Sequence, residues 1–251
     1  MSSQFYIPPF NSSLTYKQFD VVYGIDIAGT THSSPYFYAT ADVAAGYSPS
    51  GIYNFPITQY SRVDDVTTLT YTHTGGPAFG VGSIVKVTGV SANSTVNYTG
   101  MLVAGGSGTI SFTNPGWPQT ASISAGAINC LSPAWSTGFF FVPTYTSKVG
   151  TQNAAITTKL GDGYEQRLSR GLNTFDQNAT WVYRDISERK MKAIVNYVQD
   201  AAGVNAFEAI TPDAYLSNQP NQKWVASDVE VEPVAFKLYN VSVPMRRVFA
   251  A

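Results

Sequence analysis

The chain has 251 residues and a formal net charge of −1, with 44% hydrophobic and only 12% charged residues. This length is enough for one large domain or two smaller ones, and the weak charge excludes a nucleic-acid-binding protein, which needs clustered Lys and Arg. No apolar run approaches the roughly 20 residues of a membrane span, and the one cysteine, Cys130, permits no internal disulfide. We expect Cys130 to be buried as a small apolar residue.

The charged residues are unevenly distributed along the chain. Residues 1–150 hold four Lys or Arg and five Asp or Glu, whereas residues 151–251 hold eleven of each. We therefore expect a domain boundary near residue 148. The charge-poor first part is rich in small polar and aromatic residues, which is typical of surfaces covered by neighbouring subunits or sugars. The N-terminus lacks the pattern of a signal peptide, so we expect synthesis in a cytoplasm.

Residues 1–62 are expected to form an N-terminal arm followed by a small β module. Pro8-Pro9 blocks regular structure in the arm, while the segments 19–23 and 36–39 are predicted strands. The aromatic strand and the Pro-Ser turn after it resemble small carbohydrate-binding modules of chitinases, which implies contact with sugars. The alternative is that these aromatic residues pack a small β core. The candidates for glycan contact are Tyr36, Tyr38, Tyr47 and Tyr53.

Residues 63–147 are expected to form a small antiparallel β-barrel or β-sandwich. The stretch VTTLTYT at 66–72 alternates with period two, and turn signals then recur along the chain. Further strands are predicted at 84–87, 98–103, 109–113 and 139–142. The order VGSIVKVTGV, YTGMLV and GTISFTNPG resembles small β domains repeated in phage tail proteins. That resemblance implies a structural insert or a surface decoration.

Residues 148–251 show strands around a single helix. Strands are predicted at 154–160 and 179–184, and two or three more close the chain, the last over 236–243 before Pro244. Asp185, with Glu188 three residues later, predicts a capping box that opens the helix, and Gly203 is placed for its left-handed C-cap. The apolar face of the helix consists of Met191, Ile194, Val195, Val198 and Ala202. The chain is therefore predicted to be mainly β with one α-helix.

The segment LGDGYEQRLSRGLNTF at 160–175 concentrates turn formers and charges. Its glycines allow a sharp backbone bend. The charges beside them could pair across a subunit boundary and fix its register, although a solvated turn with local ion pairs is the alternative. The candidate assembly residues are Gly161, Asp162, Gly163, Tyr164, Glu165, Arg167 and Arg170.

The succession GDGYEQR, GLN, TWVY, a capped helix, GVNAF, KWV and YNVSV over residues 150–250 is similar to the phage lambda-type minor tail protein M family. Members resemble distal tail proteins. The resemblance therefore implies an α+β domain that forms a ring, sixfold or threefold, between the tail tube and the tip complex of a virion. The implied partners are further copies of the chain and other tail proteins, with synthesis in the bacterial host. A typical member has only a short lead before this motif, whereas a long N-terminal part precedes it here.

Nothing in the sequence assembles into an active site, so we expect no enzymatic activity, no cofactor and no metal. A hydrolase needs a base, and the two histidines, His32 and His73, lie in loops rich in Gly, Ser and Thr. Asp26 with Asp64 and Asp65 could form a glycosidase-like carboxylate pair, but their separation does not follow from the sequence. The first hypothesis is a virion structural protein of a phage tail. The alternative is a tail module that binds host-surface glycans.

Overall fold

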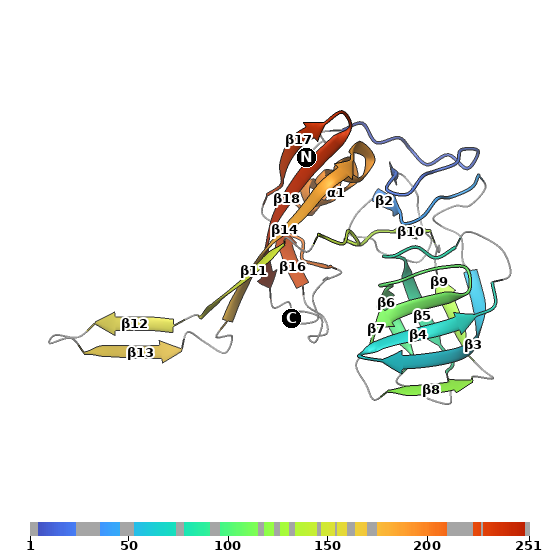
Figure 1. Ribbon diagram of the computed structural model, residues 1–251, viewed down its shortest axis with the longest axis horizontal. Coiled ribbons are helices and arrows are strands. Elements are labelled where there is room, and N and C mark those ends of the chain that lie inside the picture. The colour runs from blue at the N-terminus through green and yellow to red at the C-terminus, as the bar shows by residue number, and fades with distance from the viewer. Residues whose placement is uncertain are drawn as a thin grey trace.

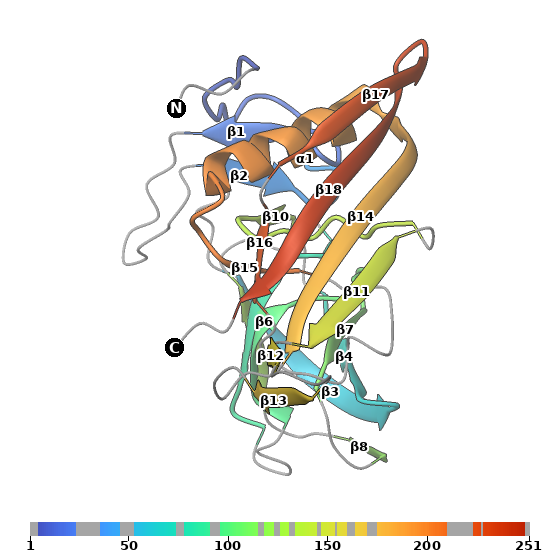
Figure 2. The same cartoon turned by 90° about the vertical axis from the view of Figure 1, so that its left-hand side faces the viewer.

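A computed structural model of the chain shows a mainly β protein with a single α-helix among its described residues, which confirms the predicted fold class (Figure 1). The structure describes residues 5–23, 36–45, 53–73, 78–90, 96–114, 118–122, 126–130, 134–144, 147–153, 155–159, 164–169, 175–209, 223–226 and 228–248. Three antiparallel sheets form the body, and a two-stranded hairpin projects from it (Figures 1 and 2). In these ranges no helix is long and apolar enough to cross a membrane.

The N-terminal sheet joins residues from distant parts of the chain. Its order is β1-β2-β10, and these strands are Val21–Tyr23, Tyr36–Ala39 and Trp135–Ser136. Ala39 pairs with Trp135 across the sheet. Directly beyond this pair, the backbone N–H of Thr40 donates to the carbonyl of Ala134 at 2.8 Å. The chain between Thr40 and Ala134 is therefore an insertion into a β-hairpin.

The insertion contains a seven-stranded antiparallel sheet that is nearly closed into a barrel (Figure 1). Its order is β6-β5-β9-β3-β4-β7, with β8 paired to β3. The strands are β3 Tyr53–Val63, β4 Val66–Tyr71, β5 Ile84–Thr88, β6 Tyr98–Met101, β7 Thr109–Thr113, β8 Gln119–Ser122 and β9 Ala127–Cys130. The side chain of Cys130 lies outside the described part of the structure.

The core of the barrel follows the predicted period of two. Leu69 in β4 faces Ile110 in β7, and both are fully buried, with alternate side chains turned outward. Strand β3 pairs with β9 through its first residues and with β4 and β8 through the rest, so it links the two halves of the sheet. The barrel therefore begins at Tyr53 and not at residue 63, where the sequence placed the start of this module.

A close backbone approach joins the barrel to the rest of the protein. Gly82 has a φ of +90°, and a Cβ at this position would collide with the side chain of Phe140. Beside it, the hydroxyls of Thr40 and Ser83 are buried and lie 3.1 Å apart. Glycine is required at position 82 both by its left-handed backbone and by the aromatic ring against it.

The C-terminal sheet carries the helix on one face. Its order is β11-β14-β18-β16-β15, and β17 also pairs with β18. The elements are β11 Lys148–Asn153, β14 Phe175–Ser187, α1 Glu188–Ala201, β15 Phe207–Glu208, β16 Lys223–Ala226, β17 Glu230–Ala235 and β18 Leu238–Val248. Trp181 and Trp224 are buried in the core below α1, with ring centroids 6.0 Å apart. Of the apolar helix face predicted from its spacing, Met191, Ile194, Val195 and Val198 are buried there as well, whereas Ala202 is exposed.

The caps of α1 differ from the prediction by one or two residues. Ser187 is the N-cap, and its hydroxyl accepts a hydrogen bond from the backbone N–H of Lys190 at 3.4 Å. Asp185 does not cap the helix, because β14 runs on to Ser187 and Asp185 lies in its bulge with a φ of 52°. At the other end Ala202, with a φ of 50°, is the left-handed C-cap, and Gly203 follows it.

Two predicted strand limits are wrong. The segment 139–142 forms no named strand, and only an isolated parallel bridge joins Phe139 to Ala209. Its phenylalanines are nevertheless buried in the core of the C-terminal sheet, where the carbonyl of Phe141 accepts a hydrogen bond from the Tyr183 hydroxyl at 2.9 Å. Strand β18 continues through Pro244. On one edge of β18 the paired strand changes from β17 to β16 around this residue, and a proline is tolerated at such an interruption of the pairing.

Candidate functional site

A two-stranded hairpin extends away from the body of the molecule (Figure 1). Its strands are β12 Ala155–Lys159 and β13 Glu165–Ser169. Within the described residues these strands pair only with each other, and in Figure 1 they lie beyond the lower end of the β11–β14 ribbon. Residues 164–169 of the segment that the sequence singled out for assembly lie in β13 and directly before it.

The two faces of this hairpin differ in chemistry. Ile156 pairs with Leu168, and both are about half exposed, at 49% and 55%. The next pair on that face is Thr158 with Gln166, so the face carries no formal charge. The opposite face carries Lys159, Glu165 and Arg167. The uncharged face therefore presents two exposed aliphatic residues on a hairpin that would be only marginally stable by itself in water.

The charges of the assembly segment form a local pair in the single chain. Arg167 Nη2 lies 2.9 Å from Glu165 Oε2, and both side chains are exposed, so the pair contributes little stability. Tyr164 precedes them and is 73% exposed. The remaining candidates of this segment, Gly161, Asp162, Gly163 and Arg170, lie outside the described residues.

The structure corrects one of the proposed glycan contacts. Tyr38 is fully buried, and its hydroxyl accepts a hydrogen bond from the side-chain amide of Asn196 at 2.9 Å. Burial raises the pKa of this hydroxyl well above its ordinary value. Tyr36 is half-buried and packs against the same core. Tyr47 lies outside the described residues, as does the side chain of Tyr53, which begins β3.

Strand β2 lies between two hydrophobic clusters, which explains the burial of Tyr38. Tyr38 belongs to the core of the C-terminal sheet, whereas Phe37 and Ala39 belong to a smaller cluster with Tyr16 and Trp135. Successive side chains of a strand point to opposite faces, so both faces of β2 are covered. An aromatic strand alone does not show whether one face or both are buried.

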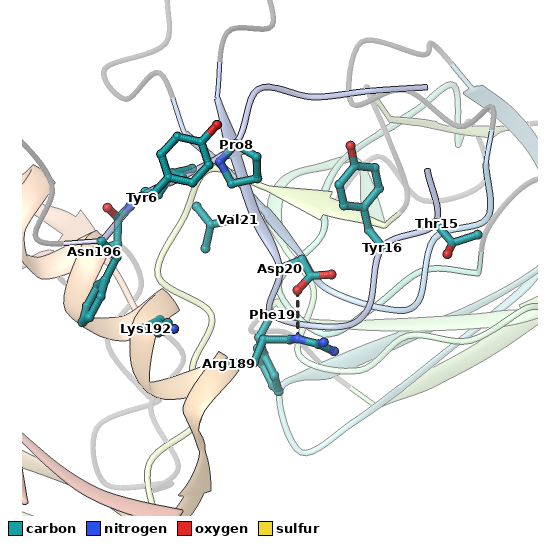
Figure 3. Close-up of a pocket in the computed structure, with 12 residues that line it drawn as sticks. Tyr6, Pro8, Thr15, Tyr16, Phe19, Asp20, Val21, Arg189, Lys192 and Asn196 are labelled. Carbon is teal, nitrogen blue, oxygen red and sulfur yellow. Dashed lines mark ion pairs between the residues drawn. The ribbon is translucent and has the colours of Figure 1, made fainter. Parts of the chain in front are cut away.

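A pocket of about 330 Å³ lies between the N-terminal segment and α1 (Figure 3). The helix contributes Arg189, Lys192 and Asn196, which share one face at a spacing of three and four residues. The N-terminal segment contributes mostly apolar side chains, namely Phe5, Ile7, Pro8, Phe19 and Val21, together with Asp20. The sequence did not indicate this pocket, since only the fold brings the two segments together.

Charged groups of this pocket are paired within the chain. Asp20 Oδ1 lies 2.9 Å from Arg189 Nε, as Figure 3 shows. Lys192 Nζ lies 2.7 Å from Glu188 Oε1 and 5.7 Å from the centroid of the Phe5 ring. The hydrogen bond of Lys192 holds the pKa of the Glu188 carboxyl below its usual value. The Asp20–Arg189 pair and the contact of Lys192 with Phe5 join the N-terminal segment to the first turns of α1, whereas the Lys192–Glu188 pair lies within the helix.

The groups considered for catalysis do not come together in the described residues. His73 stacks on Phe55 with ring centroids 5.6 Å apart, next to the barrel core. Asp64 and Asp65 form the β3–β4 turn, with φ of 47° and 63°. His32 and Asp26 lie outside the described residues. Over the ranges described, no group of three or more His, Cys, Asp or Glu residues could hold a metal ion.

Comparisons with known proteins give no match: no family model, no curated protein and no solved structure matches this chain.

Proposed function

We propose that this chain is a structural protein of a phage tail or tail tip, and that it assembles with further copies of itself into a ring between the tail tube and the tip. Its action is to bind through surfaces rather than to turn over a substrate. Its partners are its own copies and the neighbouring tail proteins of the virion.

The projecting hairpin β12–β13 is the observation that supports this role most directly. It coincides with the start of the segment that resembles the minor tail protein M family. Its side chains at 156–159 and 164–168 are all exposed. A projecting hairpin on which Ile156 and Leu168 are about half exposed fits a protein that acts as a subunit.

Mass photometry and negative-stain images of the purified protein at rising concentration test this proposal. We expect closed species of three or six copies. Antibodies against the chain should label intact particles at the distal tail. A protein that stays monomeric at every concentration and is absent from purified particles would contradict the proposal.

A further inference from the structure

Two strands at opposite edges of the C-terminal sheet have a free side. These strands are β11 and β17, of six residues each, and among the described residues β11 pairs only with β14 and β17 only with β18. All six side chains of β17 are exposed, and so are those of residues 148–151 in β11. A free edge presents unpaired backbone N–H and C=O groups, so each of the two strands can accept a further strand.

The directions of the strands determine how two such edges can combine. Neighbouring strands are antiparallel from β11 through β14 and β18 to β17, so β11 and β17 run in opposite directions at the two sides of the sheet (Figure 2). Antiparallel pairing of β17 from one copy with β11 of the next therefore leaves both copies in the same orientation. Such a head-to-tail contact joins two different surfaces and can close into a ring.

The apolar side chains at the two edges match in one register. Val149 pairs with Ala179, and Ala179 is buried in the core below α1. Val231 pairs with Val241, which is buried in the same core. Because cross-strand pairs share a face, Val149 and Val231 both lie on the face that carries α1, and they are 37% and 40% exposed. Placing Val149 opposite Val231 continues this apolar face from one copy into the next.

The same register brings opposite charges together on the other face of the sheet. Lys148 then lies opposite Glu232, and both side chains are exposed. Neither makes an ion pair with a described residue of its own chain, and Glu232 accepts only a long hydrogen bond of 3.4 Å from Asn240. Opposite charges directly across two strands attract each other, so this pair favours the contact between copies.

The edge of β17 is less suited to pairing with a second copy of itself. Antiparallel pairing of two such strands about Val231 would place Glu230 of each copy opposite Glu232 of the other, and like charges in this position repel. Pro233 has no backbone N–H, and the register of β17 shifts directly after it, so the usable edge ends there. The acidic edge of β17 therefore selects the basic edge of β11.

We propose that β17 of one copy pairs antiparallel with β11 of the next, with Val231 opposite Val149 and Glu232 opposite Lys148. The C-terminal sheet thereby becomes continuous through successive copies. This inference rests on the proposed self-assembly and names the two surfaces that join. A closed ring pairs every edge, whereas an open row of copies leaves one β11 and one β17 without a neighbour at its ends.

Disulfide trapping tests the register between copies. On a Cys130→Ser background, a chain with both Val149→Cys and Val231→Cys is oxidised at a concentration where the wild type forms oligomers. Residues directly opposite in two strands have Cβ atoms about 4.5–5.5 Å apart, which is close to the geometry of a disulfide. We expect a ladder of covalent multimers that collapses to the single chain on reduction.

The matched control for this experiment combines Lys148→Cys with Val231→Cys, which places the two thiols on opposite faces of the sheet. It should give at least about 10-fold less cross-linked product. Equal cross-linking of the two double variants would overturn the proposed register. A covalent dimer from Val149→Cys alone would show that β11 pairs with itself and would overturn it as well.

Charge reversal gives a second test that does not depend on introduced cysteines. We expect Lys148→Glu and Glu232→Lys each to associate about 10-fold more weakly than the wild type, because like charges then face each other between copies. A chain with both substitutions should recover most of the association, and so should an equal mixture of the two single variants. Lys86→Glu makes the same charge change at an exposed position of the barrel and should have no effect.

The outcomes separate this contact from the proposed function. Wild-type association of both single variants, or no recovery in the chain with both substitutions, would overturn the pairing of β17 with β11 and leave the ring proposal standing. A wild type that never associates would overturn both.

Discussion

The side-chain amide of Asn196 in α1 donates a hydrogen bond to the hydroxyl of Tyr38 in β2, across 158 residues of sequence. Both residues are buried, and Phe139 and Phe141 pack beside them in the same core. The N-terminal strands therefore belong to the same packed unit as the C-terminal sheet, although the barrel separates them along the chain. A structural unit of this protein is thus not a continuous stretch of sequence.

Replacing Tyr38 by Phe should lower the free energy of unfolding by about 1–3 kcal/mol, because the amide of Asn196 loses its acceptor in a buried position. Urea unfolding followed by tryptophan fluorescence measures the change. Tyr6→Phe is the matched control, since Tyr6 is 87% exposed and its hydroxyl should be dispensable. Equal stability of the two variants would show that the buried hydrogen bond does not contribute.

The stability of the protein should fall above pH 10. Burial raises the pKa of Tyr38 and of Tyr183, so these hydroxyls stay neutral in the folded chain after they have ionised in the unfolded chain. The unfolded state then binds fewer protons, and each such group lowers the stability by up to about 1.4 kcal/mol per pH unit. Burial lowers the pKa of Lys190. Just below pH 10 the unfolded state therefore binds more protons at this group than the folded state, so its contribution to stability rises with pH.

Unfolding measured between pH 8 and pH 12 tests whether the stability falls as the pH rises. Tyr183→Phe should be less stable than the wild type near neutral pH, because the carbonyl of Phe141 loses its donor. Its loss of stability at alkaline pH should be shallower than that of the wild type. Parallel curves for the two proteins would mean that Tyr183 does not carry the alkaline effect.

Opposite faces of the projecting hairpin should respond differently to a new charge. Ile156→Glu places a carboxylate on the uncharged face and should abolish oligomers, because a buried charge without a partner is strongly unfavourable. Thr157→Glu, one residue further on the opposite face, should leave assembly nearly unchanged. Both monomers should keep their stability within about 0.5 kcal/mol, since both positions are exposed. Equal loss of assembly in both variants would contradict the assignment of the faces.

The N-cap of α1 can be tested by a pair of neighbouring substitutions. Ser187→Ala should lower stability by about 1 kcal/mol, because it removes the acceptor for the N–H of Lys190. Asp185→Asn keeps a residue that tolerates the left-handed backbone and should change stability little. A larger effect at Asp185 than at Ser187 in thermal unfolding would restore the capping box predicted from the sequence.

Removing the barrel should leave a folded protein. The backbone bond from Thr40 to Ala134 closes the β2–β10 hairpin, so a flexible linker of Gly and Ser can replace residues 46–132. Circular dichroism and limited proteolysis should show the C-terminal sheet and α1 intact, with a lower melting temperature because Phe140 loses its contact with Gly82. An unfolded remainder would show that the barrel is required for the other unit to fold.

Local patterns predicted the elements whose spacing is regular. The alternation over 66–72 gave β4, and the 3.6-residue period gave the buried face of α1, because these signals depend only on neighbouring residues. The burial of Tyr38 and the pocket at Asn196 could not be predicted in this way. Both depend on contacts between segments on either side of the barrel. The turn residues singled out the segment 160–175, but the projection of β12 and β13 from the body is visible only in the structure.

The insertion of the barrel into the β2–β10 hairpin also sets an order for folding during synthesis. All strands of the barrel have been translated once Cys130 leaves the ribosome, whereas β2 must wait for Trp135 and then for α1 and β14. The barrel can thus complete its core while the aromatic strand β2 has only β1 as a partner and still lacks β10 and the core around α1. A stalled nascent chain whose residues up to 134 have emerged from the ribosome should carry a protease-resistant barrel and a cleavable N-terminal segment.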